Sequence, residues 1–163
     1  MAAFTGTPVD GPVRAKEKDY ATKVDSHLKG SVKYIDFDVY THSAGAGTGE
    51  INLGKLPAGT IRIIPDLCRI ITSQFAANAD LHIGHRAYTQ EDGTAVAEDD
   101  NEWLDNADAG GGALDTVLTD GGTTANQYNS KEGIEVFAMV DTGNIEDTDT
   151  IRLIIAYMGR EGI

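Results

Sequence analysis

Short apolar runs separated by turn-forming residues dominate the pattern of hydrophobic and polar positions in this chain. The densest part extends from Leu56 to Tyr88 and contains three such runs, at 61–64, 67–72 and 81–83. Each run is bounded by Pro, Gly, Asn or Asp, as the strands of an antiparallel sheet commonly are. The pattern therefore predicts that these runs form the central strands of one sheet-based domain.

The segment that precedes this stretch alternates with a period of two. Ile35, Phe37 and Val39 are expected to face a core, as on a strand with one buried side. Tyr34 and Tyr40 would then lie on the opposite face, among aspartates. Two tyrosines in that setting suit either solvent or a contact with another subunit.

Two late runs, at 134–140 and 150–158, are apolar on both faces. This pattern indicates either a two-layer sandwich or a buried contact between subunits. Further short strands are expected at 51–53 and 114–118, while 126–131 is expected to be a polar loop. With about eight strands and no convincing long helix, the predicted fold is all-β, an antiparallel β-sandwich that is jelly-roll-like.

The first 30 residues differ from the rest of the chain. Pro and Gly interrupt them early, and their apolar residues are scattered without a period. We predict an extended N-terminal arm at 1–30 and a β-sandwich domain at 31–163. The arm is either a frayed terminus or a segment that becomes ordered along a neighbouring subunit. In the second case, the expected contact residues are Phe4, Val9, Val13 and Tyr20.

The 163 residues include 26 acidic and 13 basic side chains, which give a formal net charge of −13. Phosphate groups repel such a chain, so nucleic acid and anionic membranes are poor partners. No run reaches the roughly 18 apolar residues of a membrane-spanning helix, and the start lacks the apolar region of a signal peptide. The protein is therefore expected to be made and used without export across a membrane.

Acidic residues concentrate between 98 and 108, in a run that is expected to form a solvated loop. Trp103 and Leu104 lie within this run and would attach it to its own domain or to a partner. The carboxylates of Asp99–Asp108 could alternatively bind Ca²⁺, although their spacing differs from that of an EF-hand. No other cofactor is expected.

Candidate catalytic groups form no recognisable pattern. His82 and His85 are three residues apart in an expected strand, so their imidazoles would face opposite sides unless Gly84 introduces a bulge. No serine lies in a Gly-x-Ser-x-Gly turn. The single cysteine, Cys68, lies in an apolar run and is expected to be buried and structural. We therefore expect no enzymatic activity, with a small hydrolase kept as an alternative.

Four short motifs follow one another through the centre of the chain. They are LPAGTIRI from Leu56, ADLHIG from Ala79, DGTAVAEDD from Asp92 and WLDNADA from Trp103. Their order resembles that of small structural proteins of tailed bacteriophages, the capsid decoration or cement proteins. The resemblance covers about 56–109 and, more loosely, the closing strand 151–158.

This resemblance implies a β-rich, non-catalytic virion protein on the outer surface of the phage head, made in the cytoplasm of the host bacterium. It implies a homotrimer that binds the major capsid protein and bridges adjoining capsid subunits, which would stabilise the assembled shell. The contact residues named above come from composition and not from the resemblance. A receptor- or carbohydrate-binding module of a tail or head fibre remains a further alternative.

Overall fold

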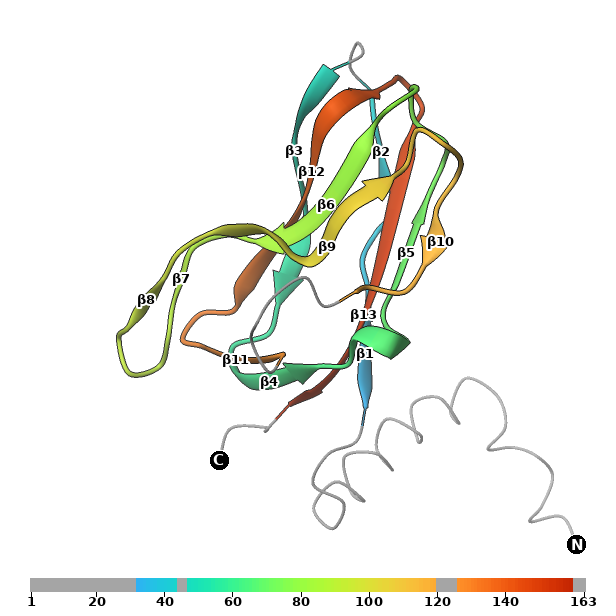
Figure 1. The fold of residues 1–163 in the computed structure, drawn as a ribbon. Coiled ribbons are helices and arrows are strands. Elements are labelled where there is room, and N and C mark those ends of the chain that lie inside the picture. The colour runs from blue at the N-terminus through green and yellow to red at the C-terminus, as the bar shows by residue number, and fades with distance from the viewer. Residues whose placement is uncertain (1–31, 44–46, 120–125, 160–163) are drawn as a thin grey trace, which may run out of the picture. The chain divides into compact units, whose positions relative to one another are not determined.

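The computed structural model describes residues 32–43, 47–119 and 126–159, and its strands belong to a unit that begins at Lys33. This unit is a sandwich of two antiparallel sheets with a small additional hairpin (Figure 1). The expected all-β antiparallel sandwich is thereby confirmed. The predicted arm at 1–30 and its contact residues Phe4, Val9, Val13 and Tyr20 lie outside the described residues.

Seven strands form the larger sheet. They are β1 (Lys33–Asp36), β2 (Tyr40–Thr41), β4 (Gly59–Ile63), β5 (Arg69–Thr72), β10 (Asp115–Thr116), β11 (Gln127–Ser130) and β13 (Thr150–Gly159). β13 lies at the centre, because it pairs with β1 and β2 along one side and with β5 and β4 along the other. β10 extends the sheet beyond β5, and β11 extends it beyond β4. A 3-10 turn, η3 (Pro65–Leu67), joins β4 to β5.

Four strands form the smaller sheet, in the order β3 (Gly47–Leu56), β12 (Ile134–Ile145), β6 (Asp80–His85) and β9 (Asp99–Asp108). β7 (Tyr88–Thr89) and β8 (Ala95–Val96) form the separate hairpin, which extends away from the sandwich (Figure 1). The chain passes repeatedly between the sheets, so the neighbours in each are distant in sequence. This arrangement is the winding of a jelly roll. The described residues contain no helix long and apolar enough to span a membrane.

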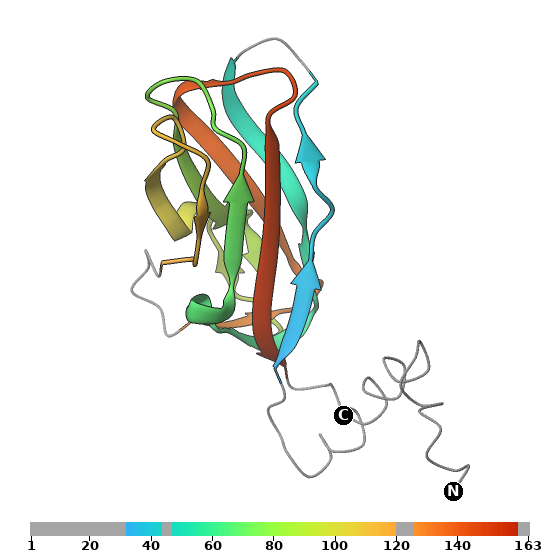
Figure 2. The same ribbon diagram turned by 90° about the vertical axis from the view of Figure 1, so that its right-hand side faces the viewer.

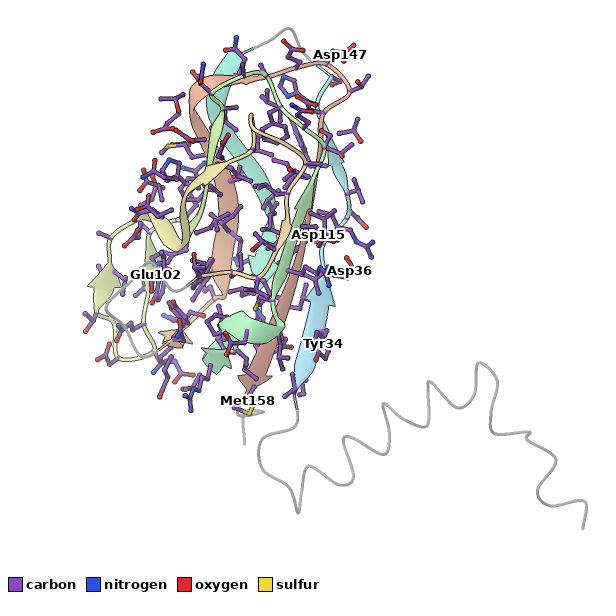
Figure 3. The ribbon with its side chains drawn as sticks, turned by 45° about the vertical axis from the view of Figure 1, so that its right-hand side comes forward. Tyr34, Asp36, Glu102, Asp115, Asp147 and Met158 are labelled. Carbon is purple, nitrogen blue, oxygen red and sulfur yellow. The ribbon has the colours of Figure 1, made fainter. Side chains whose placement is uncertain are left out.

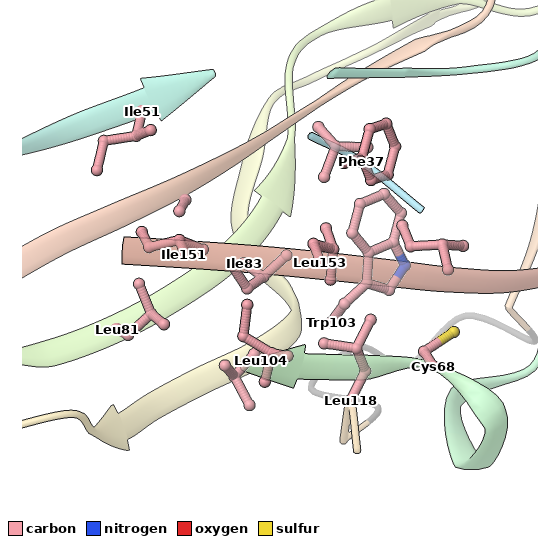
Figure 4. Close-up of a cluster of buried hydrophobic side chains, with 14 of the residues drawn as sticks. Phe37, Ile51, Cys68, Leu81, Ile83, Trp103, Leu104, Leu118, Ile151 and Leu153 are labelled. Carbon is pink, nitrogen blue, oxygen red and sulfur yellow. The ribbon is translucent and has the colours of Figure 1, made fainter. Parts of the chain in front are cut away.

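The hydrophobic core lies between the two sheets and is built from alternate residues of their strands. Ile151 and Leu153 of β13 and Leu81 and Ile83 of β6 are completely buried there (Figure 4). The long strand β12 is buried on both faces, as its pattern predicts, since Phe137 on its outer side is also inaccessible to solvent. Burial of these branched and aromatic side chains supplies the main driving force for folding.

An extra residue between β1 and β2 reverses the faces that alternation predicts. Asp36 pairs with Ile154, and Tyr40 pairs with Ile151. The three residues 37–39 therefore lie opposite only the two residues 152–153 of β13. A β-bulge of this kind moves the side chains that follow it to the other face of the sheet. Tyr40 therefore packs against the core, whereas Val39 is 53% exposed.

The acidic run expected to be a solvated loop is the strand β9, and this prediction is wrong. Trp103 and Leu104 are 1% and 3% exposed and belong to the core (Figure 4). Gly84 allows β9 to begin where it does, because a Cβ at this position would collide with the backbone of Asp99 and Asp100. The pairing of β9 with β6 is irregular between Ile83 and His85, and the adjacent residues Trp103 and Leu104 both reach the core from a strand that is otherwise rich in carboxylates.

The expected polar loop at 126–131 is also a strand, β11, in which Tyr128 is buried. The Trp103 Nε1 donates a hydrogen bond to the Tyr128 hydroxyl at 2.7 Å, and this hydroxyl donates to Glu102 Oε1 at 2.6 Å. The ring of His85 lies 5.7 Å from that of Trp103 and 6.2 Å from that of Tyr128. The cluster joins β9 and β6 of the smaller sheet to β11 of the larger one, and its hydrogen bonds make burial of Glu102 tolerable.

Removal of one hydroxyl from this cluster should destabilise the fold. In Tyr128→Phe, the buried indole N–H loses its acceptor and the Glu102 carboxylate loses a donor. We expect the free energy of unfolding in urea to fall by about 2 kcal/mol. Tyr34→Phe is the matched control, because the Tyr34 side chain is 59% exposed and its change should remain within about 0.5 kcal/mol. Equal stability of the two variants would contradict this assignment.

The Cys68 thiol is buried, as its apolar setting predicts. Its Sγ lies 3.3 Å from the carbonyl oxygen of Ile64 and accepts the backbone N–H of Ala156 at 3.2 Å. Burial raises the pKa of this thiol to about 11. The thiol is therefore protonated at neutral pH and contributes packing, not reactivity.

Alkylation should show how strongly the fold protects this thiol. With a pKa of about 11, Cys68 has roughly a hundredfold less thiolate at neutral pH than a free cysteine, so native protein should react slowly with iodoacetamide. Urea should restore the rate of an ordinary cysteine. Tyr34→Cys provides the control, since its second thiol should be labelled quickly in the native state. Fast labelling of the native wild-type protein would refute the structural role.

Candidate protein interaction surface

Four large apolar side chains among the described residues from Lys33 onwards are exposed, and all belong to the larger sheet or its border. Tyr34 is 59% exposed, Val39 53%, Leu67 47% and Val117 41%. Tyr34 and Val39 lie along β1 and β2, and Val117 follows β10. Leu67 lies in η3, which borders the same side of the molecule (Figure 2). Exposed apolar residues that gather on one side commonly mark a contact with another protein.

Pairing with β13 determines which residues of the larger sheet point away from the core. Tyr34 lies directly opposite Ala156, and Asp36 lies opposite Ile154. Residues directly opposite each other share a face of the sheet. Ile155, between Ile154 and Ala156 on β13, is buried in the core, so its two neighbours and their partners face away from the core. We call the solvent side of the larger sheet the outer face. Its members are Tyr34, Asp36, Val39, Arg62, Arg69, Ile71, Asp115, Val117, Arg152, Ile154, Ala156 and Met158.

The outer face has an apolar floor between charged groups. Ile154 and Ile71, on the adjacent strands β13 and β5, are partly buried, and Ala156 beside them is completely covered. Tyr34 stands beside Ala156, and Figure 3 shows Tyr34, Asp36 and Asp115 on this side of the molecule. A partner placed here would therefore meet aliphatic side chains and one exposed tyrosine ring.

Two bidentate ion pairs cross the strands of the outer face. Arg152 binds Asp36 through Nε at 3.0 Å and through Nη2, and Arg69 binds Asp115 through Nε and through Nη2 at 2.8 Å. Hydrogen bonds from these guanidinium groups lower the pKa of both carboxyl groups. Each pair is therefore ionised and internally neutral at neutral pH. Such exposed pairs contribute little to stability, but they balance the charge of this surface.

The solvent side of the smaller sheet has the opposite character. His82 is buried there between Asp105 Oδ1, 3.2 Å from its Nδ1, and Asp141 Oδ1, 3.3 Å from its Nε2. Asp80 lies close by, since its Oδ2 accepts the hydroxyl of Thr142 at 2.7 Å. Carboxylates therefore surround the imidazole on this side of the sandwich.

A second charged group covers the same side of the smaller sheet. The guanidinium of Arg86 lies 4.0 Å above the centre of the Phe137 ring and binds Glu50 at 2.6 Å and Glu98 at 3.1 Å. Phe137 is thereby shielded by charged residues instead of being available to a partner. Among the described residues from Lys33 onwards, the large exposed apolar residues lie on the larger sheet or its border and not here. The two sides of the sandwich thus differ in both charge and apolar content.

The predicted contact residues occupy different environments. Tyr34 is exposed on the outer face, whereas Tyr40 is half-buried and its hydroxyl lies 2.8 Å from His42 Nδ1. Trp103 and Leu104 are buried in the core, so they attach β9 to its own domain and present no surface to a partner. The sequence analysis did not identify Leu67 and Val117 as exposed. What the sequence does indicate is an apolar outer face on the larger sheet, because the residues of its central strand β13 are apolar on both faces.

The reactive side chains His82, His85 and Ser73 are engaged in structural contacts. His82 and His85 face opposite sides of β6, as their spacing predicts, and His85 lies in the core. Ser73 Oγ donates to Asp149 Oδ1 at 2.8 Å and accepts the Thr150 N–H at 3.0 Å. No three His, Cys, Asp or Glu side chains of the described residues are grouped to hold a metal ion. Calcium binding by Asp99–Asp108 thus stays an untested prediction.

Comparisons with known proteins agree with the fold just described. No protein-family model and no curated protein sequence matches this chain. A chain in the solved capsid of Ralstonia phage GP4 has a TM-score of 0.62 and 18% identity, over 81% of this chain and 86% of that one. A chain in the capsid asymmetric unit of cyanophage Pam1 has a TM-score of 0.53 and 12% identity, over 80% and 86%. The chain therefore has a fold that occurs in two phage capsids, which confirms the resemblance to phage virion proteins at the level of the fold.

Proposed function

We propose that this chain is a structural protein of a phage virion, and specifically a decoration protein on the outer surface of the head. The observation that carries this proposal is the fold shared with chains of two phage capsids over four fifths of this chain. The motif order in 56–109, which resembles that of decoration proteins, supports it independently. The proposed partners are the major capsid protein and other copies of this chain, assembled as a homotrimer.

The proposed mechanism is stabilisation by binding. A protein that binds the assembled shell, and not its separated subunits, shifts the equilibrium towards the shell by mass action. A bridge between adjoining capsid subunits would add to this effect, because both contacts must break before a subunit leaves. The arm at 1–30 would provide a second contact, which raises the effective concentration of the first.

The side-chain environments favour this role over the two alternatives. A hydrolase needs a nucleophile that a base can activate, but Ser73 Oγ and Asp149 both also accept backbone N–H groups, of Thr150 and Glu146, and the Cys68 thiol is buried and protonated. A carbohydrate-binding module would use exposed aromatic rings near Trp103, which is itself only 1% exposed. We therefore propose a non-enzymatic protein that acts through its surface.

Deletion of Met1–Gly30 tests the role of the arm. The remaining chain retains every strand of the sandwich, so its circular dichroism and cooperative unfolding should persist. Its affinity for expanded empty capsids should fall at least about tenfold, since one of two linked contacts is lost. Co-sedimentation over a range of concentrations measures this affinity, with the full-length chain as control. Equal binding of the two proteins would exclude the arm as an attachment segment.

Shell stability tests the decoration role itself. Addition of the full-length protein to undecorated expanded capsids should raise their dissociation temperature. Once the concentration of free protein exceeds the dissociation constant, the increase should grow with the logarithm of that concentration. The Tyr128→Phe variant serves as a control at temperatures where it is still folded. Its substitution lies in the core and leaves the surface unchanged, so it should stabilise the shell as the wild-type protein does. A shell that binds the protein to saturation without any gain in stability would rule out this mechanism.

A further inference from the structure

We propose that the outer face of the larger sheet is a contact surface between copies of this chain. This inference rests on the proposed function for its expectation of self-assembly, and it assigns that assembly to named residues. Tyr34 and Val117 lie on opposite sides of the face, with Ile154 and Ile71 between them. The two sides of the sandwich differ in ways that leave this face as the suitable one.

The first reason is apolar content. Tyr34, Val39, Leu67 and Val117 each expose more than two fifths of their surface, and they lie on or beside one sheet. Tyrosine and aliphatic residues at the centre of a surface, with polar groups around them, are typical of protein contacts. On the solvent side of the other sheet, Arg86 covers the ring of Phe137. Burial of the outer face would therefore remove the main exposed apolar area of the described unit from water.

The second reason is charge. Each copy has a formal charge of −13, so two copies repel each other over most of their surfaces. The outer face is an exception, because Arg152 and Arg69 neutralise Asp36 and Asp115. Arg62, opposite Met158 on the same face, adds a positive charge. A second copy can approach this face without facing an excess of carboxylates, whereas the acidic side of the smaller sheet would oppose it.

The third reason is that four of the five charged groups assigned to this face are already paired with one another. An arginine that enters an interface without a partner must lose its hydration, which costs several kcal/mol. Each guanidinium of the two bidentate pairs instead keeps its hydrogen bonds to an aspartate of its own chain. A neighbouring copy therefore needs to supply no partner for these four groups. This favours an identical neutral surface or another weakly charged part of the same chain over a strongly charged ligand such as nucleic acid.

Sedimentation equilibrium on purified wild-type and variant proteins tests this assignment without any shell. The outer-face variant is Tyr34→Glu with Val117→Glu, which places a carboxylate at two exposed positions on opposite sides of the face. The control is Thr48→Glu with Ala95→Glu, which adds the same charge at exposed positions of β3 and β8. Urea unfolding establishes that both double variants are folded.

We expect the wild-type protein and the control to self-associate with similar affinity. The outer-face variant should have a dissociation constant at least about tenfold higher, because burial of an unpaired carboxylate costs more than the roughly 1.4 kcal/mol that corresponds to a factor of ten. Association of the wild-type protein should also strengthen as salt increases, since salt screens the repulsion between acidic copies and leaves the apolar contact intact.

Three results would overturn the assignment. They are a wild-type protein that is monomeric over the whole concentration range, an outer-face variant that associates like the control, and association that weakens markedly with salt. If the outer-face variant associates normally but no longer binds capsids, the face belongs to a capsid subunit and only this inference fails. If self-association depends on the outer face but the wild-type protein does not bind capsids, the decoration role fails and this inference stands.

Discussion

Pairing around β13 is the constraint on which the rest of this structure depends. This one strand forms hydrogen bonds with β1 and β2 on one side and with β5 and β4 on the other. Ile151, Leu153 and Ile155 point from it into the core, while Arg152 and Ile154 point outwards. The register of β13 therefore determines both the packing between the sheets and the composition of the outer face. Its two apolar sides thus face two different environments, the core between the sheets and the outer face proposed as a contact surface.

The contrast between the two sides of the sandwich follows from what covers each sheet. On the smaller sheet, Arg86 is held by Glu50 and Glu98 above Phe137, and His82 is enclosed by carboxylates. Charged residues there complete the burial of the strands below them. On the larger sheet, Arg69 and Arg152 are held in internal pairs, and Ile71 and Ile154 between them are only partly buried. The net negative charge opposes association over most of the surface and, in the proposed contact, favours the side where charge is balanced.

The sequence predicts the strands whose alternation is strong, but not those that depend on distant partners. β12 and β13 are evident from their apolar runs, whereas β9 is obscured by carboxylates around Trp103 and Leu104. The bulge that exposes Val39 is likewise invisible locally, because it exists only relative to β13, more than a hundred residues later. The outer face has the same limitation. Val117 looks like an ordinary strand residue until pairing of β10 with β5 places it at the surface.

The ion pairs of the outer face also bear on why this surface remains exposed. Since Asp36 and Asp115 are solvent-exposed, their pairs with arginine add little to the stability of the isolated chain. Their value is greater when a neighbour covers them, because a pair that is already bidentate is less costly to desolvate than two separate charges. The same pairs hold Arg152 and Arg69 in one geometry before contact, so less side-chain entropy is lost on association. A face built for solvent alone would need neither the fixed pairs nor the apolar floor between them, and their combination supports the proposed contact between copies.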